Sequence, residues 1–204
     1  MSTNKSAEIF NTVMNNALKF PAVKVDREAF LRNAFSEYCT KEQLTQIIKQ
    51  NPRAILEIDL LAKNVIKVAR LEVTAVSAAT GVAGNPFAVA GLAVADMAQY
   101  VCFCLNLCQK LAYIYGFPDL MEDGKLTPNS VNILTPFLAV MFGVSGSKFI
   151  PALGALISGT ITYAAFGPSA NKLAEKLRYN SDFFKDVIKT AEEFDEDAEF
   201  EEFI

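Results

Sequence analysis

The side chains that could carry chemistry in this chain are four cysteines and a few acids set on apolar helices. Cys102, Cys104 and Cys108 fall on one predicted helix, and Cys39 lies alone upstream. A zinc site of three thiolates needs its ligands on one helix face, whereas Cys102 lies far around the helix from Cys104 and Cys108. We therefore expect buried apolar thiols and no metal. Because the four cysteines form no disulfide framework, they indicate a reducing compartment.

Two acids of the apolar region are the next candidates for chemistry. Glu72 and Asp96 would form a carboxylate pair if their helices meet, although an ion pair with a neighbouring base such as Arg70 is the commoner role. The chain has no histidine, so the commonest general base and metal ligand is missing. No nucleophile elbow, P-loop or dinucleotide-binding motif is present. The sequence predicts a protein that is not an enzyme and uses no cofactor.

A further set of polar residues is ordered along the helix predicted over residues 86–115. Asp96, Gln99, Asn106 and Lys110 fall within about an 80° sector of that helix. Two interpretations are open for this polar seam. It is either the solvent face of a helix in a bundle, or a polar strip that lines a ligand cavity or the interior of a membrane bundle.

Charge is distributed very unevenly along the chain, which has a net charge of −4 and a mean hydropathy of +0.22. Between Leu71 and Asn171 only eight of 101 residues are charged. Residues 191–204 form an acidic tail with eight acids and no base, so the rest of the chain has 15 acids against 19 bases. This basic body favours an anionic membrane face or is ordinary surface charge.

The remaining pattern is helical throughout, without sustained period-two alternation. Asp26 is a predicted N-cap, Thr40 with Gln43 fits a capping box, and Thr127 before Pro128 opens a later helix. We predict an all-α fold: a single helical bundle of about eight helices over residues 1–190.

The helix predicted over residues 52–79 is two-faced. Its polar stripe consists of Asp59, Lys63, Lys67, Arg70 and Thr74. Its apolar residues facing elsewhere are Ile55, Ile58, Leu61, Ala62, Val65, Ile66 and Ala69.

Two Gly-rich apolar helical hairpins are predicted, over about residues 68–115 and 128–166, and they belong either in a core or in a membrane. Residues 73–95 are uncharged but are divided by a breaker, and residues 149–166 are only marginally long enough to span. Small residues at four-residue spacing, such as Gly154 and Ser158, suit close helix packing. The predicted hinge and turn residues are Gly81, Gly84, Asn85, Pro86, Gly116, Gly167 and Pro168.

Short motifs over about residues 70–166 resemble the EcsC family and the related YcjF-like domain of unknown function. The matching residues are Gly81, Gly84 and Gly91, then Asp96 in AVADMAQ, then Tyr115 and Gly116 in YGFPD. A second Gly-rich apolar pair of helices follows over residues 131–166. The resemblance implies helical, membrane-associated proteins, some linked to transport or secretion, and it brings no catalytic residues.

The predicted function is that of a non-catalytic, membrane-associated protein, peripheral or embedded on the cytoplasmic side, whose apolar hairpins embed in, insert into or bind lipid. The N-terminus shows no signal-peptide pattern. One alternative is a soluble interaction module of immunity or adaptor type that docks through its acidic tail or first helices. Another is a conditional pore former. The expected partner is membrane lipid or a protein, homo-oligomerisation is open, and nucleic acid is excluded because no basic cluster is interleaved with aromatics.

Overall fold

The computed structural model confirms the all-α class. It describes residues 17, 20, 23–49, 58–80, 95–122, 125–143, 165–179, 183, 185 and 187. The helices within these ranges are α2 (Arg27–Phe35), α3 (Lys41–Lys49), α4 (Ile58–Thr80), α6 (Ala95–Ile114), α7 (Pro128–Met141) and α9 (Phe166–Tyr179).

Six helices thus lie in the described part of the chain, where the sequence predicts about eight for the whole. The predicted breaker at Gly81, Gly84, Asn85 and Pro86 lies outside the described residues, as do most of the second apolar hairpin and the acidic tail. What the structure shows is the all-α class and the packing of these six helices.

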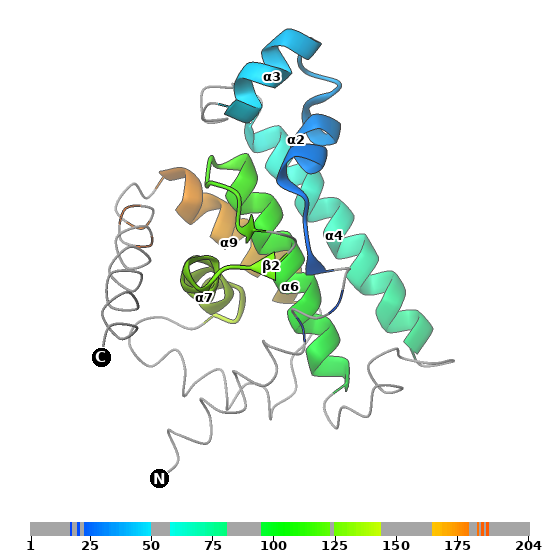
Figure 1. Cartoon of the computed structure of the whole chain (residues 1–204). Coiled ribbons are helices and arrows are strands. Elements are labelled where there is room, and N and C mark those ends of the chain that lie inside the picture. The colour runs from blue at the N-terminus through cyan, green and yellow to red at the C-terminus, as the bar shows by residue number, and fades with distance from the viewer. Residues whose placement is uncertain are drawn as a thin grey trace, which may run out of the picture.

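Figure 1 shows α4 and α6 as long helices that run side by side, with α2 and α3 at one end. α4 also packs along α9, and α7 packs against both α6 and α9. α6 contacts four other helices and is therefore the centre of the described fold. Its residues Leu105, Leu107 and Leu111 are fully buried in the common hydrophobic core.

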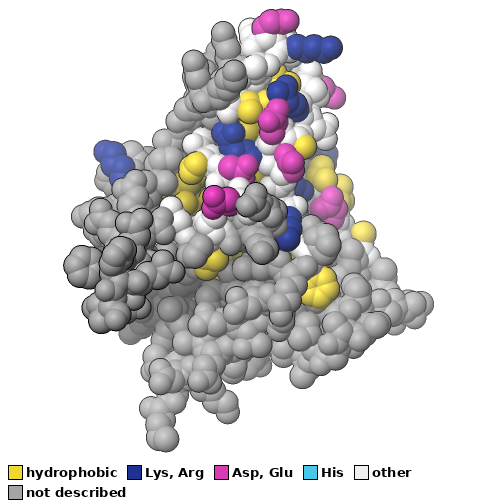
Figure 2. All heavy atoms as spheres, in the orientation of Figure 1, with side chains coloured by type: hydrophobic (Ala, Val, Ile, Leu, Met, Phe, Trp, Pro, Cys, Tyr) yellow, Lys and Arg dark blue, Asp and Glu magenta, His cyan; other side chains and the backbone are white. Residues whose placement is uncertain are grey.

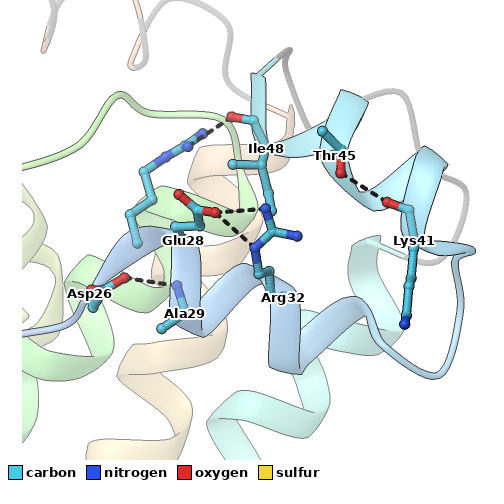
Figure 3. Close-up of polar contacts among 8 residues, drawn as sticks. Asp26, Glu28, Ala29, Arg32, Lys41, Thr45 and Ile48 are labelled. Atoms are coloured by element: carbon cyan, nitrogen blue, oxygen red, sulfur yellow. Dashed lines mark hydrogen bonds and ion pairs between the residues drawn. The ribbon is translucent and has the colours of Figure 1, made fainter.

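The predicted N-caps of α2 and α3 are confirmed. Asp26 Oδ1 accepts a 2.8 Å hydrogen bond from the backbone N–H of Ala29 (Figure 3). The capping box is reciprocal: the Thr40 N–H donates to Gln43 Oε1 at 2.9 Å, and the Gln43 N–H donates to Thr40 Oγ1 at 3.3 Å. Both satisfy N–H groups that a helix start leaves without intrahelical partners.

The predicted boundaries around α6 and α7 are also present in the structure. Gly116 adopts a φ of 91°, and the N–H groups of Gly116 and Phe117 donate back to Tyr113 and Ala112. This is a Schellman ending, which needs a left-handed residue and therefore favours glycine. α7 begins after Thr127, whose hydroxyl accepts a hydrogen bond from the Ser130 N–H at 3.1 Å.

The loop predicted between α6 and α7 contains a minimal antiparallel hairpin that the sequence analysis missed. β1 (Met121–Glu122) pairs with β2 (Lys125–Leu126), with Glu122 opposite Lys125. Two-residue strands are too short for periodicity to reveal them.

The two-faced character predicted for α4 is confirmed by burial. The buried residues on the inner face of α4 are Ile58, Leu61, Ala62, Ile66, Ala69 and Val73. The polar residues Lys63, Lys67, Arg70 and Thr74 are exposed. α4 is thus a bundle helix whose outer face lies open to solvent.

Candidate functional site

The polar seam predicted on α6 lies on the central helix of the fold. Gln99 is buried, and Asn106 and Lys110 are half-buried. Asp96 stands in the first turn of α6, but its side chain lies outside what the structure describes. At Gln99, the interpretation as a simple solvent face is therefore ruled out.

Gln99 has a buried side-chain oxygen, Oε1, that has no hydrogen-bond partner within the described structure. Burying an unpaired carbonyl costs about 1–3 kcal/mol. The unpaired oxygen of Gln99 therefore destabilises the packing around the first turns of α6.

Gln109 is the polar residue of α6 that the sequence analysis missed. It is fully buried, and its Nε2 donates to the Val23 carbonyl at 2.7 Å and to the Leu105 carbonyl at 3.1 Å. Its Oε1 accepts from the Val25 N–H at 3.3 Å. Gln109 therefore holds residues 23–25, which precede α2, against the central helix α6. In the sequence Gln109 lies between Cys108 and Lys110, and nothing in that local pattern signals this role.

Arg27 supports the same junction from the start of α2. Its Nε donates to the Phe117 carbonyl at 3.2 Å, and its Nη1 donates to the Ile48 carbonyl at 3.0 Å. Its guanidinium also lies 6.0 Å from the centre of the Tyr113 ring. Figure 3 shows the Ile48 carbonyl of α3 accepting one of these bonds. Arg27 thus joins α2, α3 and the end of α6.

Three of the four cysteines are buried, as expected. Cys102, Cys104 and Cys108 are buried at their positions on α6, and Cys39 is half-buried. Burial raises the pKa of the Cys102 thiol to about 12 and raises the pKa of Cys104 and Cys108 as well. A thiol with a raised pKa is a poor nucleophile and a poor metal ligand. Within the described residues, no cluster of three or more acids or cysteines is placed to hold a metal.

The proposed pair of Glu72 and Asp96 lies outside what the structure describes, because the side chain of Asp96 is not among the described residues. Glu72 and Arg70 are both exposed on α4, and residues two apart on a helix do not face each other. Arg70 instead lies along α9, where a Cβ added to Gly167 would come within 3.2 Å of its Cδ. Gly167 and Pro168 stand in the first turn of α9, where proline is tolerated, rather than in a turn before it.

A half-open groove of about 430 Å³ lies between α4 and α9. Its floor is apolar, with the buried residues Ile66 and Tyr115. Its rim carries charges of both signs, and Asp59 of α4 forms an ion pair with Arg178 of α9. The complete lining is Asp59, Ala62, Lys63, Ile66, Tyr115, Asn171, Ala174, Glu175 and Arg178. Such a lining can hold a small solute by ion pairs and hydrogen bonds over an apolar floor.

Beside this groove, the outer face of α4 carries an apolar stripe that the sequence analysis missed. Leu60, Val68 and Leu71 are 49%, 53% and 61% exposed, and they are the large hydrophobic side chains that the described structure leaves exposed. At 100° per residue they fall within about an 80° sector. We call these three residues the α4 stripe. The sequence alone could have revealed this stripe. On a helical wheel Leu60, Val68 and Leu71 surround Asn64 and therefore lie on the polar side of α4.

Figure 2 shows the molecule from the same side as Figure 1. Charged side chains of both signs gather over the upper part, and hydrophobic side chains show along the right-hand edge, over α4. None of the described helices combines the length and the continuous hydropathy that crossing a bilayer requires.

Comparison with protein-family models, with curated proteins and with solved structures finds no match to this chain. The resemblance of residues 70–166 to the EcsC family therefore rests on the sequence motifs alone.

Proposed function

We propose that this protein is a non-catalytic helical protein that binds membrane lipid on the cytoplasmic side of a membrane. The observation that carries the proposal is the α4 stripe. A soluble bundle usually scatters its exposed leucines and valines singly. Here Leu60, Val68 and Leu71 share one sector of one helix, so that they can enter a common apolar surface together.

The sequence that follows the stripe supports the same function. No residue between Val73 and Ala95 is charged, so α4 leads directly into an apolar segment. The resemblance to the EcsC family implies membrane association as well. Four free thiols agree with a reducing, cytoplasmic environment.

The chemistry of the described residues supports a binding role over catalysis. The thiols of α6 are buried and their pKa values are raised, so they are held in the unreactive protonated form. Gln109 and Arg27 bond to backbone carbonyls of distant segments and so stabilise the fold.

Sedimentation with vesicles tests this function. The full-length protein is mixed with vesicles of phosphatidylcholine, with or without phosphatidylserine, and centrifuged. We expect the wild type to pellet with vesicles, and Leu60→Ser with Leu71→Ser to weaken binding by about tenfold or more, because each buried leucine contributes about 1.5–3 kcal/mol. The matched control is Ala29→Ser, at an exposed position of α2.

The outcome that contradicts the proposal is a wild-type protein that stays in the supernatant with every lipid composition. A monodisperse protein that ignores vesicles would favour the soluble interaction module instead. A carbonate wash of pelleted material separates surface binding from embedding, because carbonate strips proteins held at the surface.

A further inference from the structure

The α4 stripe has a basic edge along one side. Lys63, Lys67 and Arg70 are all exposed, and at 100° per residue they occupy about a 60° sector directly beside Leu60 and Leu71. They follow one another at intervals of four and three residues, so each lies one turn along from the last. We call these three residues the basic edge.

The acids near this surface do not cancel the basic edge. Asp59 of α4 and Glu175 of α9 line the groove together with Lys63, and the charge of Asp59 is balanced there by its ion pair with Arg178 of α9. Glu72 lies on the opposite border of the stripe, past Val68. The exposed face of α4 therefore combines a strip of apolar side chains with three positive charges on one side.

We infer that the outer face of α4 is a binding surface for anionic lipid, and that α4 lies along the membrane surface with its basic edge at the headgroups. This inference rests on the proposed function and names its lipid class. Anionic lipid is the ligand that matches the charge of this face. The three cations complement negative headgroups, and the apolar strip beside them complements the hydrocarbon beneath the headgroups. The core of a protein interface, in contrast, is depleted of lysine.

The geometry of the face suits this arrangement. From Leu60 to Leu71 the stripe extends about 16 Å along the helix. The long lysine and arginine side chains at its border can keep their aliphatic stems on the apolar surface while their charged ends reach the headgroups. α4 presents this face without rearrangement, because its other side is already buried against α6 and α9.

The test compares two sets of three charge-removing substitutions with the same change in net charge. The first is Lys63→Gln, Lys67→Gln and Arg70→Gln on the basic edge. The control is Lys41→Gln, Lys172→Gln and Lys185→Gln, at exposed positions of other segments. Binding is measured by sedimentation with vesicles of phosphatidylcholine alone and with vesicles in which about a third of the lipid is phosphatidylserine.

We expect the wild type to bind the anionic vesicles more tightly than the neutral ones. Each cation removed from the basic edge should weaken binding to the anionic vesicles about fivefold, and the set of three about a hundredfold. The control set should weaken binding severalfold at most. Raising the salt concentration from about 0.1 M to about 0.5 M should reduce the difference between wild type and the first set.

Several results would overturn the inference without touching the proposed function. These are equal binding to neutral and anionic vesicles, or equal losses in the two sets. If Leu71→Ser disrupts a dimer of the protein and leaves lipid binding unchanged, the stripe is a contact with a second copy of the chain, and the proposed function loses the observation that carries it. Absence of binding to any vesicle would overturn the proposed function itself. Circular dichroism of all variants checks that they are folded.

Discussion

Gln109 donates a 2.7 Å hydrogen bond from its side-chain amide to the carbonyl of Val23, 86 residues earlier in the chain. The same side chain accepts from the Val25 N–H, so its amide bonds to the backbone on both sides of Lys24. The buried Val23 carbonyl and Val25 N–H thereby gain partners that no α-helix or sheet supplies. One glutamine on the central helix fixes where the N-terminal part of the fold lies.

The two buried glutamines of α6 should respond in opposite ways to the same substitution. Gln109→Met removes three hydrogen bonds and leaves backbone groups of Val23 and Val25 buried without partners, so we expect a loss of about 3 kcal/mol in the free energy of unfolding. Gln99→Met removes an oxygen that is already unpaired, and should leave stability unchanged or raise it slightly. Urea unfolding followed by circular dichroism measures both. Equal losses in the two variants would refute the assigned roles.

Arg27 and Arg32 form a second matched pair, both on α2. Arg27→Met deletes charge-assisted hydrogen bonds to two backbone carbonyls, those of Phe117 and Ile48, and should cost about 2–3 kcal/mol. Arg32→Met deletes a 2.6 Å ion pair with Glu28 whose side chains are 44% and 61% exposed. That pair is screened by solvent and should contribute less than about 1 kcal/mol. Thermal unfolding of the two variants gives the comparison, and a larger loss for Arg32→Met would contradict it.

The sequence predicted most reliably those features that are determined by neighbouring residues. The caps at Asp26 and Thr40 were predictable because each depends on a partner only three residues away. The stop at Gly116 was predictable because its left-handed backbone is a local requirement. Local chemistry therefore accounts for the starts of α2 and α3 and for the end of α6.

The contacts that were missed join residues far apart in the chain. Nothing local marks Gln109 as the partner of Val23, or Gly167 as the residue against which Arg70 lies. The α4 stripe was overlooked for a related reason: whether Leu60 and Leu71 are covered depends on which helices pack beside α4. The periodicity of one helix shows that it has two faces, but not how wide the covered face is.

Thiol reactivity should separate Cys39 from the other cysteines. Only the thiolate reacts with Ellman's reagent, and burial raises the pKa of the Cys102 thiol to about 12. At pH 8 we expect one accessible thiol in the folded protein, lost in Cys39→Ser, and four in the unfolded wild type. Rapid reaction of three or four thiols in the folded protein would show that the cysteines of α6 are accessible to solvent.

Stability should fall in alkali because the buried thiols keep their protons in the folded state. Burial raises the pKa of Cys102 from 9.0 to about 12, and burial likewise raises the pKa of Cys104, Cys108 and the Tyr113 hydroxyl. Above pH 9 the unfolded chain releases protons that the folded chain retains, so unfolding becomes more favourable as pH rises toward 12.

Each such thiol should contribute up to about 1.4 kcal/mol per pH unit over that range. Unfolding free energies in urea at pH 8, 9 and 10 measure the slope, with Cys102→Ala as the comparison because it removes one ionising group. A slope that is the same in wild type and Cys102→Ala would assign the effect to other groups.

The contact between Gly167 and Arg70 can be measured by a double-mutant cycle. An added Cβ at Gly167 would lie 3.2 Å from Arg70 Cδ, closer than ordinary contact, but Arg70 is exposed and its flexible side chain can move aside. Alanine also raises helix propensity relative to glycine by up to about 1 kcal/mol. We therefore expect Gly167→Ala to change stability by less than about 1 kcal/mol in the wild type, and to stabilise more strongly in Arg70→Ala, where the crowding is absent. A difference of about 0.5 kcal/mol between the two backgrounds would establish the contact, whereas strict additivity would show that α9 does not approach Arg70 this closely.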